Sequence, residues 1–309
     1  MTETSLTPDT LVMAAPAEEA PVRAAAKPRA AMLGHVLYVL RENPVTGLAF
    51  AMFAFFVGSA LLGAWLVPYD PLATDATATL QPPSAQHWFG TDNLGRDVFS
   101  RVIVATRLDL MISVAAVAMS FVIGSVLGAV AGYRGGLIDV ATSRVLDTIM
   151  AFPLFVLAMG IVAALGNTVA NIIYATAIIN IPFYARLVRA EVNIRRDAGF
   201  TLAAKLAGNS DARVLAFHIF PNALPPMMVQ VSLNLGWAIL NAAGLSFIGL
   251  GVRPPTPEWG IMVAEGANYI VSGEWWLALF PGLWLMLAVF TFNLMGDGLR
   301  DIVDPRQRT

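Results

Sequence analysis

Residues 46–67, TGLAFAMFAFFVGSALLGAWLV, contain no charged side chain and end at a polar turn that holds Pro68, Asp70 and Pro71. At about 1.5 Å per residue, a helix of this length crosses roughly 30 Å of hydrocarbon. The whole chain has the same character, because 57% of its 309 residues are hydrophobic, 13% are charged and its mean hydropathy is +0.67. A soluble domain carries about twice that charge, so the sequence predicts an integral membrane protein.

Further uncharged runs follow at residues 110–131, 148–165, 169–185, 223–250 and 275–295. Together with the first, they predict an all-α fold, a polytopic transmembrane helical bundle of six spans. Pro153 and Pro182 can kink or shorten the third and fourth spans. A very tight turn at Gly166, Asn167 and Thr168 separates these two spans.

Basic residues are distributed unequally between the two sides of this six-span arrangement. Four of the 19, Arg96, Arg101, Arg107 and Arg253, fall on one side, and the other fifteen fall on the opposite side. Because loops rich in Lys and Arg stay in the cytoplasm, both termini are expected to be cytoplasmic. Tryptophans gather near the predicted outer boundary, as in an aromatic belt: Trp65, Trp88, Trp259, Trp275 and Trp276.

The sequence divides into four parts. Residues 1–36, rich in Ala, Pro and Glu, are expected to be a disordered cytoplasmic extension and not a signal peptide, and residues 300–309 a cytoplasmic tail. Residues 37–106 hold the first span and an outer loop. Residues 107–299 hold the other five spans and a cytoplasmic hairpin at 195–222.

The outer loop ends in a stretch in which Leu94, Val98 and Val102 recur every four residues. With Thr91 or Asp92 as the N-cap, this spacing predicts a short amphipathic, interfacial helix on the outer membrane surface. The alternative is a solvated loop helix with no role beyond packing.

The second predicted span carries Gly124, Gly128 and Gly132 on one helix face. Such a face lets two helices approach closely in lipid, which predicts a packing surface without naming its partner. The alternative is that glycine is simply common in membrane helices.

The longest cytoplasmic segment predicts a helix, a glycine turn and a second helix. Leu202 and Leu206 stack at helical spacing, and Gly208 suits a left-handed residue that ends the first helix. Asn209, Ser210 and Asp211 can cap the second helix, which Pro221 is expected to stop. An apolar, cationic hairpin in water is covered either by a partner protein or by the protein's own helix ends, and the pattern leaves both possibilities open.

Several chemistries are excluded. With no cysteine, the chain has no disulfide, thiolate metal site or cysteine nucleophile. The phosphate-binding pattern G-x-x-x-x-G-K-[ST] and the G-x-S-x-G elbow are both missing, so an ATP site has to lie on another chain. His35, His87 and His218 fall in different segments, so no metal site, cofactor or catalytic residue is expected.

The predicted spans hold amides rather than ionisable groups: Asn171, Asn180, Asn234, Asn241 and Asn293. Asn234 and Asn241, seven residues apart, share one face of the fifth span, with Gly236 and Gly244 close by. This face lines a substrate path or makes hydrogen bonds between helices. A stand-alone secondary transporter normally needs carboxylates or histidines within its spans, and an intramembrane protease needs paired catalytic residues, neither of which the sequence shows.

The hairpin resembles a motif of bacterial ABC importer permeases, EAA-x3-G-x9-I-x-L-P. Leu202, Ala203, Ala204, Gly208 and Pro221 keep its spacing, whereas Leu202, His218 and Phe220 replace its Glu, Ile and Leu. Leu202 carries no charge and makes no salt bridge at the position of the glutamate, while the spacing of the hairpin is kept. The ending His218-Ile219-Phe220-Pro221-Asn222 is similar to that of the dipeptide, oligopeptide and nickel branch.

Two more stretches resemble the same branch: Gly90-Thr91-Asp92 with Gly95-Arg96-Asp97 and Ser100-Arg101, and Leu245 to Val252 followed by Pro254 to Gly260. The resemblance covers roughly residues 36–305 and is to the C-type permease with the type I ABC importer fold. It implies that the hairpin couples to an ATPase through Leu202, Ala203, Ala204, Lys205, Gly208, Asn209 and Ser210.

The resemblance also implies partners: a homologous B-type permease in a heterodimer, two cytoplasmic ATPase subunits, an external substrate-binding protein and membrane lipid, with no nucleic acid. The chain then forms half of a translocation pathway in a bacterial inner membrane. Its candidate path residues are Asn234, Gly236 and Asn241. The substrate is not readable, because dipeptides, oligopeptides, glutathione and nickel chelates are all handled by this branch.

Overall fold

The computed structural model describes residues 43–303. The predicted extension at 1–36 lies outside the described residues, as does the tail beyond residue 303. The described helices, in chain order, are α2 (Pro44–Leu66), α3 (Val98–Arg134), α4 (Gly136–Ala151), α5 (Leu154–Leu165), α6 (Val169–Arg195), α7 (Gly199–Leu206), α8 (Asp211–Arg213), the π-helical η1 (Val214–Ile219), α9 (Phe220–Phe247), α10 (Trp259–Ala267) and α11 (Trp276–Val303). The only β pairing in this part of the chain is one isolated bridge, so the all-α prediction is confirmed.

Five helical stretches are long and apolar enough to cross a membrane: α2, α3, α6, the continuous stretch Asp211–Phe247, and α11. A sixth exists if α4 and α5, which meet at 89°, together form one span. Residues 43–303 therefore contain five spans, or six if the bent pair is one crossing, and the predicted third run at 148–165 straddles the bend. Pro153 causes the break, because its ring is incompatible with a helix interior and holds the preceding Phe152 in an extended conformation (φ −86°, ψ 147°).

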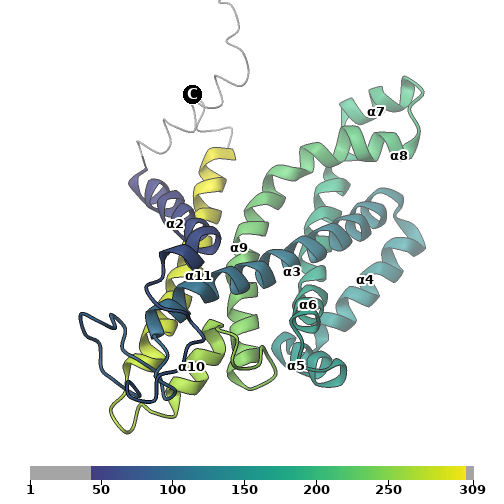
Figure 1. Ribbon diagram of the computed structural model, residues 1–309. Coiled ribbons are helices and arrows are strands. Elements are labelled where there is room, and N and C mark those ends of the chain that lie inside the picture. Colours follow the sequence, from purple (N-terminus) through teal and green to yellow (C-terminus); the bar gives the residue numbers. More distant parts are fainter. Residues whose placement is uncertain (1–42, 304–309) are drawn as a thin grey trace, which may run out of the picture.

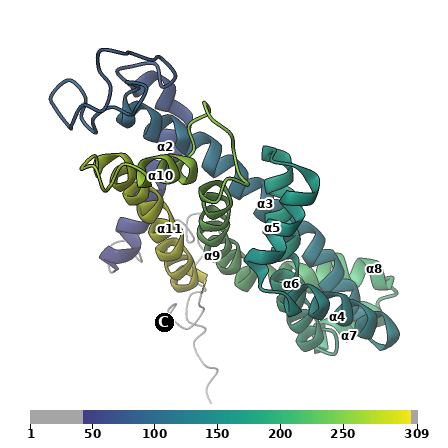
Figure 2. The ribbon, with the colours of Figure 1, turned by 90° about the horizontal axis from the view of Figure 1, so that it is seen from below.

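The helices form two groups that α3 connects. Figure 2 shows α2, α10 and α11 on one side and α4, α5, α6 and the α7–α8 hairpin on the other, with α9 between them. In Figure 1 the start of α2, the end of α11 and the hairpin lie toward the upper end of the molecule. The loop before α3 and the helix α10 lie at the lower end. We call residues 67–97 together with 248–275 the loop lobe.

The helices α3 and α6 pack backbone to backbone. A Cβ atom at Gly128 would lie 2.2 Å from the carbonyl oxygen of Ala185 on α6. At Gly124 and Gly132 the nearest α6 atoms would lie at 2.8 Å. The predicted glycine face is therefore confirmed, and its partner is α6.

The predicted short interfacial helix is wrong. The helix begins only at Val98, where Asp97 caps it by accepting from the Ser100 N–H at 2.8 Å, and it continues unbroken to Arg134. Asp92 does not cap a helix, because its carboxylate accepts from the N–H groups of Leu94 and Arg96 at 2.9 and 3.0 Å and folds a turn instead. The boundary placed between residues 106 and 107 therefore falls inside α3.

Pro221 does not stop the second arm of the hairpin. The six-residue π-helical segment η1 leads directly into α9, and Pro221 is the second residue of α9. The missing N–H of Pro221 falls where the wider π-helical hydrogen-bond pattern, in which the Phe220 N–H donates to the Leu215 carbonyl, changes to the α-helical pattern. The second arm and the fifth span are therefore one continuous stretch, Asp211–Phe247.

Candidate functional site

The turn of the α7–α8 hairpin has the geometry that the sequence predicts. Gly208 adopts φ +82°, in the left-handed region that favours glycine. Ser210 is the N-cap of α8, because its Oγ accepts from the Arg213 N–H at 3.4 Å. The Asn209 side chain reaches back and donates to the Ala204 carbonyl at 2.9 Å, which closes the end of α7.

The hairpin has one face turned inward and one turned outward. Of the residues with an expected coupling role, Ala204 is buried and packs in a cluster with Val188 and Val214, and Asn209 is half-buried. The others are exposed: Leu202, Ala203, Lys205, Gly208 and Ser210. The neighbouring Leu206 and Phe217 are 90% and 73% exposed. The protein's own helices thus cover one face and leave the other, apolar face open.

A second candidate site is a groove on α9. The groove has a volume of about 390 Å³ and is lined by Phe183, Gln230, Leu233, Asn234, Trp237, Leu240, Val289 and Asn293. The amide Nε2 of Gln230 donates to Oδ1 of Asn234 at 2.9 Å. The groove combines amides with aromatic rings, which suits a neutral polar solute better than a lone ion.

The three residues expected to line the path do not lie together. Asn234 lines the groove, whereas Asn241 is not among its lining residues and donates to the Trp237 carbonyl on its own helix at 3.1 Å. Gly236 is also not among the lining residues, and a Cβ there would lie 3.2 Å from the Val289 carbonyl of α11, so this glycine lets α9 and α11 approach closely. A helix turns through about 200° over two residues, so Gly236 lies nearly opposite Asn234 on α9. Its role is in helix packing and not on the face that carries Asn234. Gln230 was missed, although its position four residues before Asn234 places it on the same face.

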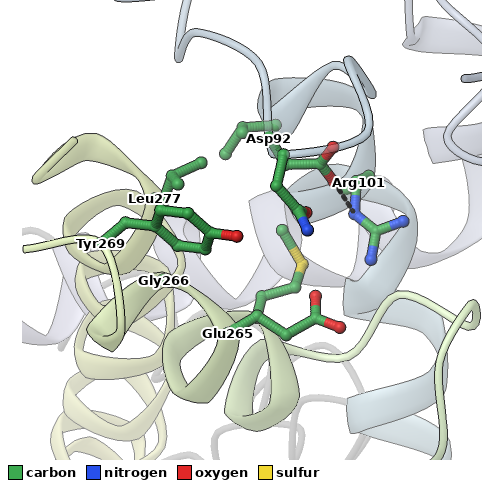
Figure 3. Close-up of a pocket in the computed structure, with 9 residues that line it drawn as sticks. Asp92, Arg101, Glu265, Gly266, Tyr269 and Leu277 are labelled. Carbon is green, nitrogen blue, oxygen red and sulfur yellow. Dashed lines mark ion pairs between the residues drawn. The ribbon is translucent and has the colours of Figure 1, made fainter. Parts of the chain in front are cut away.

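The loop lobe contains a buried charge cluster (Figure 3). One oxygen of Asp92 lies 2.6 Å from Nε of Arg96. The same oxygen lies 3.6 Å from Nε of Arg101, the pair that Figure 3 draws. Nη2 of Arg96 lies 3.8 Å from Glu265 on α10. Arg101 is 1% exposed and also donates to backbone carbonyls of both loops, those of Pro71 and Pro255. The cavity beside these groups is only about 20 Å³, room for about one water molecule, and the cluster joins the two loops.

Buried carboxyl groups hold α10 against α3. Glu258 caps α10 by accepting from the N–H groups of Gly260 and Ile261 at 2.9 and 2.8 Å. Its neighbour Trp259 donates its backbone N–H to Asp109 at 3.2 Å and its indole N–H to the Val102 carbonyl at 3.0 Å. Burial raises the pKa of Glu258. Within residues 43–303 no three His, Asp or Glu side chains are placed to hold a metal ion.

A bundle of long apolar helices with a capped hairpin at one end is the architecture of a multi-pass membrane protein. Residues 124–309 match the family described as the binding-protein-dependent transport system inner membrane component. Residues 31–83 match the N-terminal transmembrane domain of oligopeptide transport permease C. The chain belongs to this family of inner-membrane components and is a C-type permease subunit of an ABC importer. Its relatives are permease subunits and not enzymes, and a stand-alone transporter is not favoured.

Relatives with assigned roles align over most of the chain. The probable D,D-dipeptide transport system permease protein DdpC of Escherichia coli strain K12 is 43% identical over 271 residues, which are 88% of this chain and 91% of DdpC. The dipeptide transport system permease protein DppC of Alkalihalophilus pseudofirmus is 42% identical over 270 residues, 87% and 88% of the two chains. The nickel transport system permease protein NikC of Escherichia coli strain K12 is 42% identical over 259 residues, 84% and 93%.

Proposed function

We propose that this chain pairs with a homologous B-type permease and forms half of the pathway through which a small peptide enters the cell. Two cytoplasmic ATPase subunits supply the energy, and an external binding protein delivers the solute. Two of the relatives described above are permeases for dipeptides, which supports a peptide over a metal chelate.

The observation that carries the coupling role is the outward face of the hairpin. Leu206 and Phe217 expose 90% and 73% of their surface on a hairpin whose other face is already packed. Apolar side chains presented beside a glycine turn suit insertion into a groove of another protein. The small residue Ala203 next to them permits close approach, and a cytoplasmic ATPase is the partner that the family implies.

The orientation follows from the same proposal. If the hairpin contacts an ATPase, its end of the molecule is cytoplasmic. The start of α2 and the end of α11 lie toward that end (Figure 1), which supports the expectation that both termini are cytoplasmic. The loop lobe then faces the external binding protein.

The groove on α9 is the proposed segment of the translocation path. Gln230, Asn234 and Asn293 offer donors and acceptors that match a peptide backbone, while Trp237 and Phe183 offer apolar surface. No charged residue lines the groove. Such a surface is expected to let peptides of different sequence pass, because it would form hydrogen bonds with the peptide backbone and not with specific side chains.

The test is co-purification with Leu206→Asp. In gentle detergent the two ATPases and the second permease should co-purify with the wild-type chain. Leu206→Asp should lose the ATPases and keep the second permease, because only the hairpin face is altered. The matched control is Val271→Asp at the opposite end, where Val271 is 98% exposed. If the Leu206 variant retains the ATPases and shows normal uptake, the docking assignment is wrong. If the purified chain alone takes up solute under an ion gradient, the importer assignment is wrong.

A further inference from the structure

Tyr133, at the cytoplasmic end of α3 in the proposed orientation, touches both arms of the hairpin. Its hydroxyl donates to Oδ1 of Asp211 on α8 at 2.6 Å. Nζ of Lys205 on α7 lies 5.2 Å from the centre of its ring, within the range of a cation–π contact. The two contacts flank the Gly208 turn, so a single side chain from another helix holds both arms.

Lys205 and Asp211, which carry opposite charges on the two arms, could have paired with each other. No ion pair joins Lys205 to Asp211 among the described residues, and each contacts Tyr133 instead. The ring of Tyr133 also packs against the apolar cluster beneath the hairpin, which includes Ala204 and Val214. The side chain of Tyr133 therefore fills the space between α3 and the hairpin. Its apolar ring packs against the cluster, and its polar hydroxyl reaches the second arm.

The helix that carries Tyr133 is rigidly held along its length. It is 37 residues long, or about 55 Å. Its C-terminal third packs closely against α6 through the glycine face at Gly124, Gly128 and Gly132. Its other end is joined to the loop lobe, because Trp259 of α10 bonds to Val102 and Asp109. A movement at Tyr133 can therefore be transmitted to the loop lobe through groups that contact one another along α3.

The hairpin's own second arm is less regular. It passes through the π-helical segment η1 before it becomes α9, and π-helical bulges are among the places where helices kink. The contact through Tyr133 bypasses this segment.

We propose that Tyr133 is a positioning residue that couples the hairpin to α3, so that ATPase closure reaches the loop lobe through α3 as well as through α9. The proposal rests on the proposed ATPase-docking function of the hairpin. It concerns the transmission of movement and not the binding of the ATPase.

The experiment uses the complete importer complex in lipid nanodiscs. It measures the ATPase rate with and without the external binding protein, purified with its native solute bound. Tyr133→Phe removes only the hydroxyl, and Asp211→Ala removes its acceptor from the other side. Each should lower the stimulation by the binding protein about threefold, as expected for loss of one hydrogen bond, with the unstimulated rate and the ATPase content of the complex unchanged.

The double variant should lose no more than either single variant, because both remove the same contact. Tyr174→Phe on α6 is the matched control, since Tyr174 is 47% exposed and its hydroxyl has no hydrogen bond among the described residues, and it should keep full stimulation.

Normal stimulation in Tyr133→Phe, or additive losses in the double variant, would overturn the proposal. If Tyr133→Phe fails to assemble, Asp211→Ala must still show the threefold loss. If neither variant assembles, the contact serves hairpin folding and the proposal fails. Failure of the docking function looks different, because the Leu206→Asp complex would then keep its ATPases, or the wild-type complex itself would contain none.

Discussion

Gly128 offers the sharpest test of the packing that holds α3 against α6. In Gly128→Ala the new Cβ would lie 2.2 Å from the Ala185 carbonyl oxygen, with the carbonyl carbon and Cα of the same residue at 2.9 and 3.0 Å. All three atoms are backbone, so no side chain can swing aside. Ordinary contact begins at about 3.4 Å, and the two helices must therefore separate locally by about 1.2 Å.

The expected cost is about 1–3 kcal/mol of unfolding free energy, the usual range for an overpacked core. Gly58 in α2 is the matched control, because nothing lies within 4 Å of a Cβ there. Gly58→Ala should be neutral or stabilising by up to about 1 kcal/mol, since alanine favours a helix over glycine. The assay is unfolding of the purified chain in mixed micelles by increasing amounts of SDS, followed by tryptophan fluorescence. Equal stability of the two alanine variants would refute the close backbone contact.

The remaining predictions concern the hairpin turn and the loop lobe. Gly208 has a φ of +82°, and a Cβ atom there would meet nothing within 4 Å, so its substitution costs backbone strain alone, about 1–2 kcal/mol. Gly208→Asn should therefore keep uptake in reconstituted vesicles and Gly208→Val should lose it, and normal uptake by the valine variant would contradict the turn's role. Because burial raises the pKa of Glu258, the folded protein holds that proton more tightly than the unfolded chain does, and stability should fall as the pH rises above the ordinary value of 4.5. Glu258→Gln should flatten the dependence of the thermal midpoint on pH, and an unchanged slope would show that another group titrates.

Features set by local rules could be predicted from the sequence. The length of the uncharged runs predicts the spans, except that the run at 148–165 straddles the bend between α4 and α5, and the spacing of Gly124, Gly128 and Gly132 predicts a packing face. The left-handed conformation of Gly208 follows from its place between two helical patterns. These predictions succeed because each depends on the geometry of one helix or one turn.

Features set by partners distant in the sequence could not be predicted. Asp92 has the chemistry of an N-cap, but Arg96 and Arg101 engage its carboxylate and the helix starts later. Arg96 and Arg101 resemble solvated loop charges, yet both are buried, because Asp92 and Glu265 compensate them. The groove on α9 likewise depends on which neighbour each face meets, and the sequence alone cannot say that Gly236 faces α11.

The failed prediction at Pro221 changes the mechanics of the hairpin. If the helix stopped at Pro221, a loop would join the hairpin to the fifth span. A loop would absorb a movement of the hairpin instead of transmitting it to the span. The structure instead has one helical stretch from Asp211 to Phe247, with Asn234 of the groove 23 residues along it, or about 35 Å. A movement imposed at the Gly208 turn can therefore reach the groove without crossing a loop. Helices kink at π-bulges and at prolines, and this arm contains η1 followed by Pro225 and Pro226 inside α9. Tyr133 contacts the hairpin before all three, so the proposed route through α3 bypasses them.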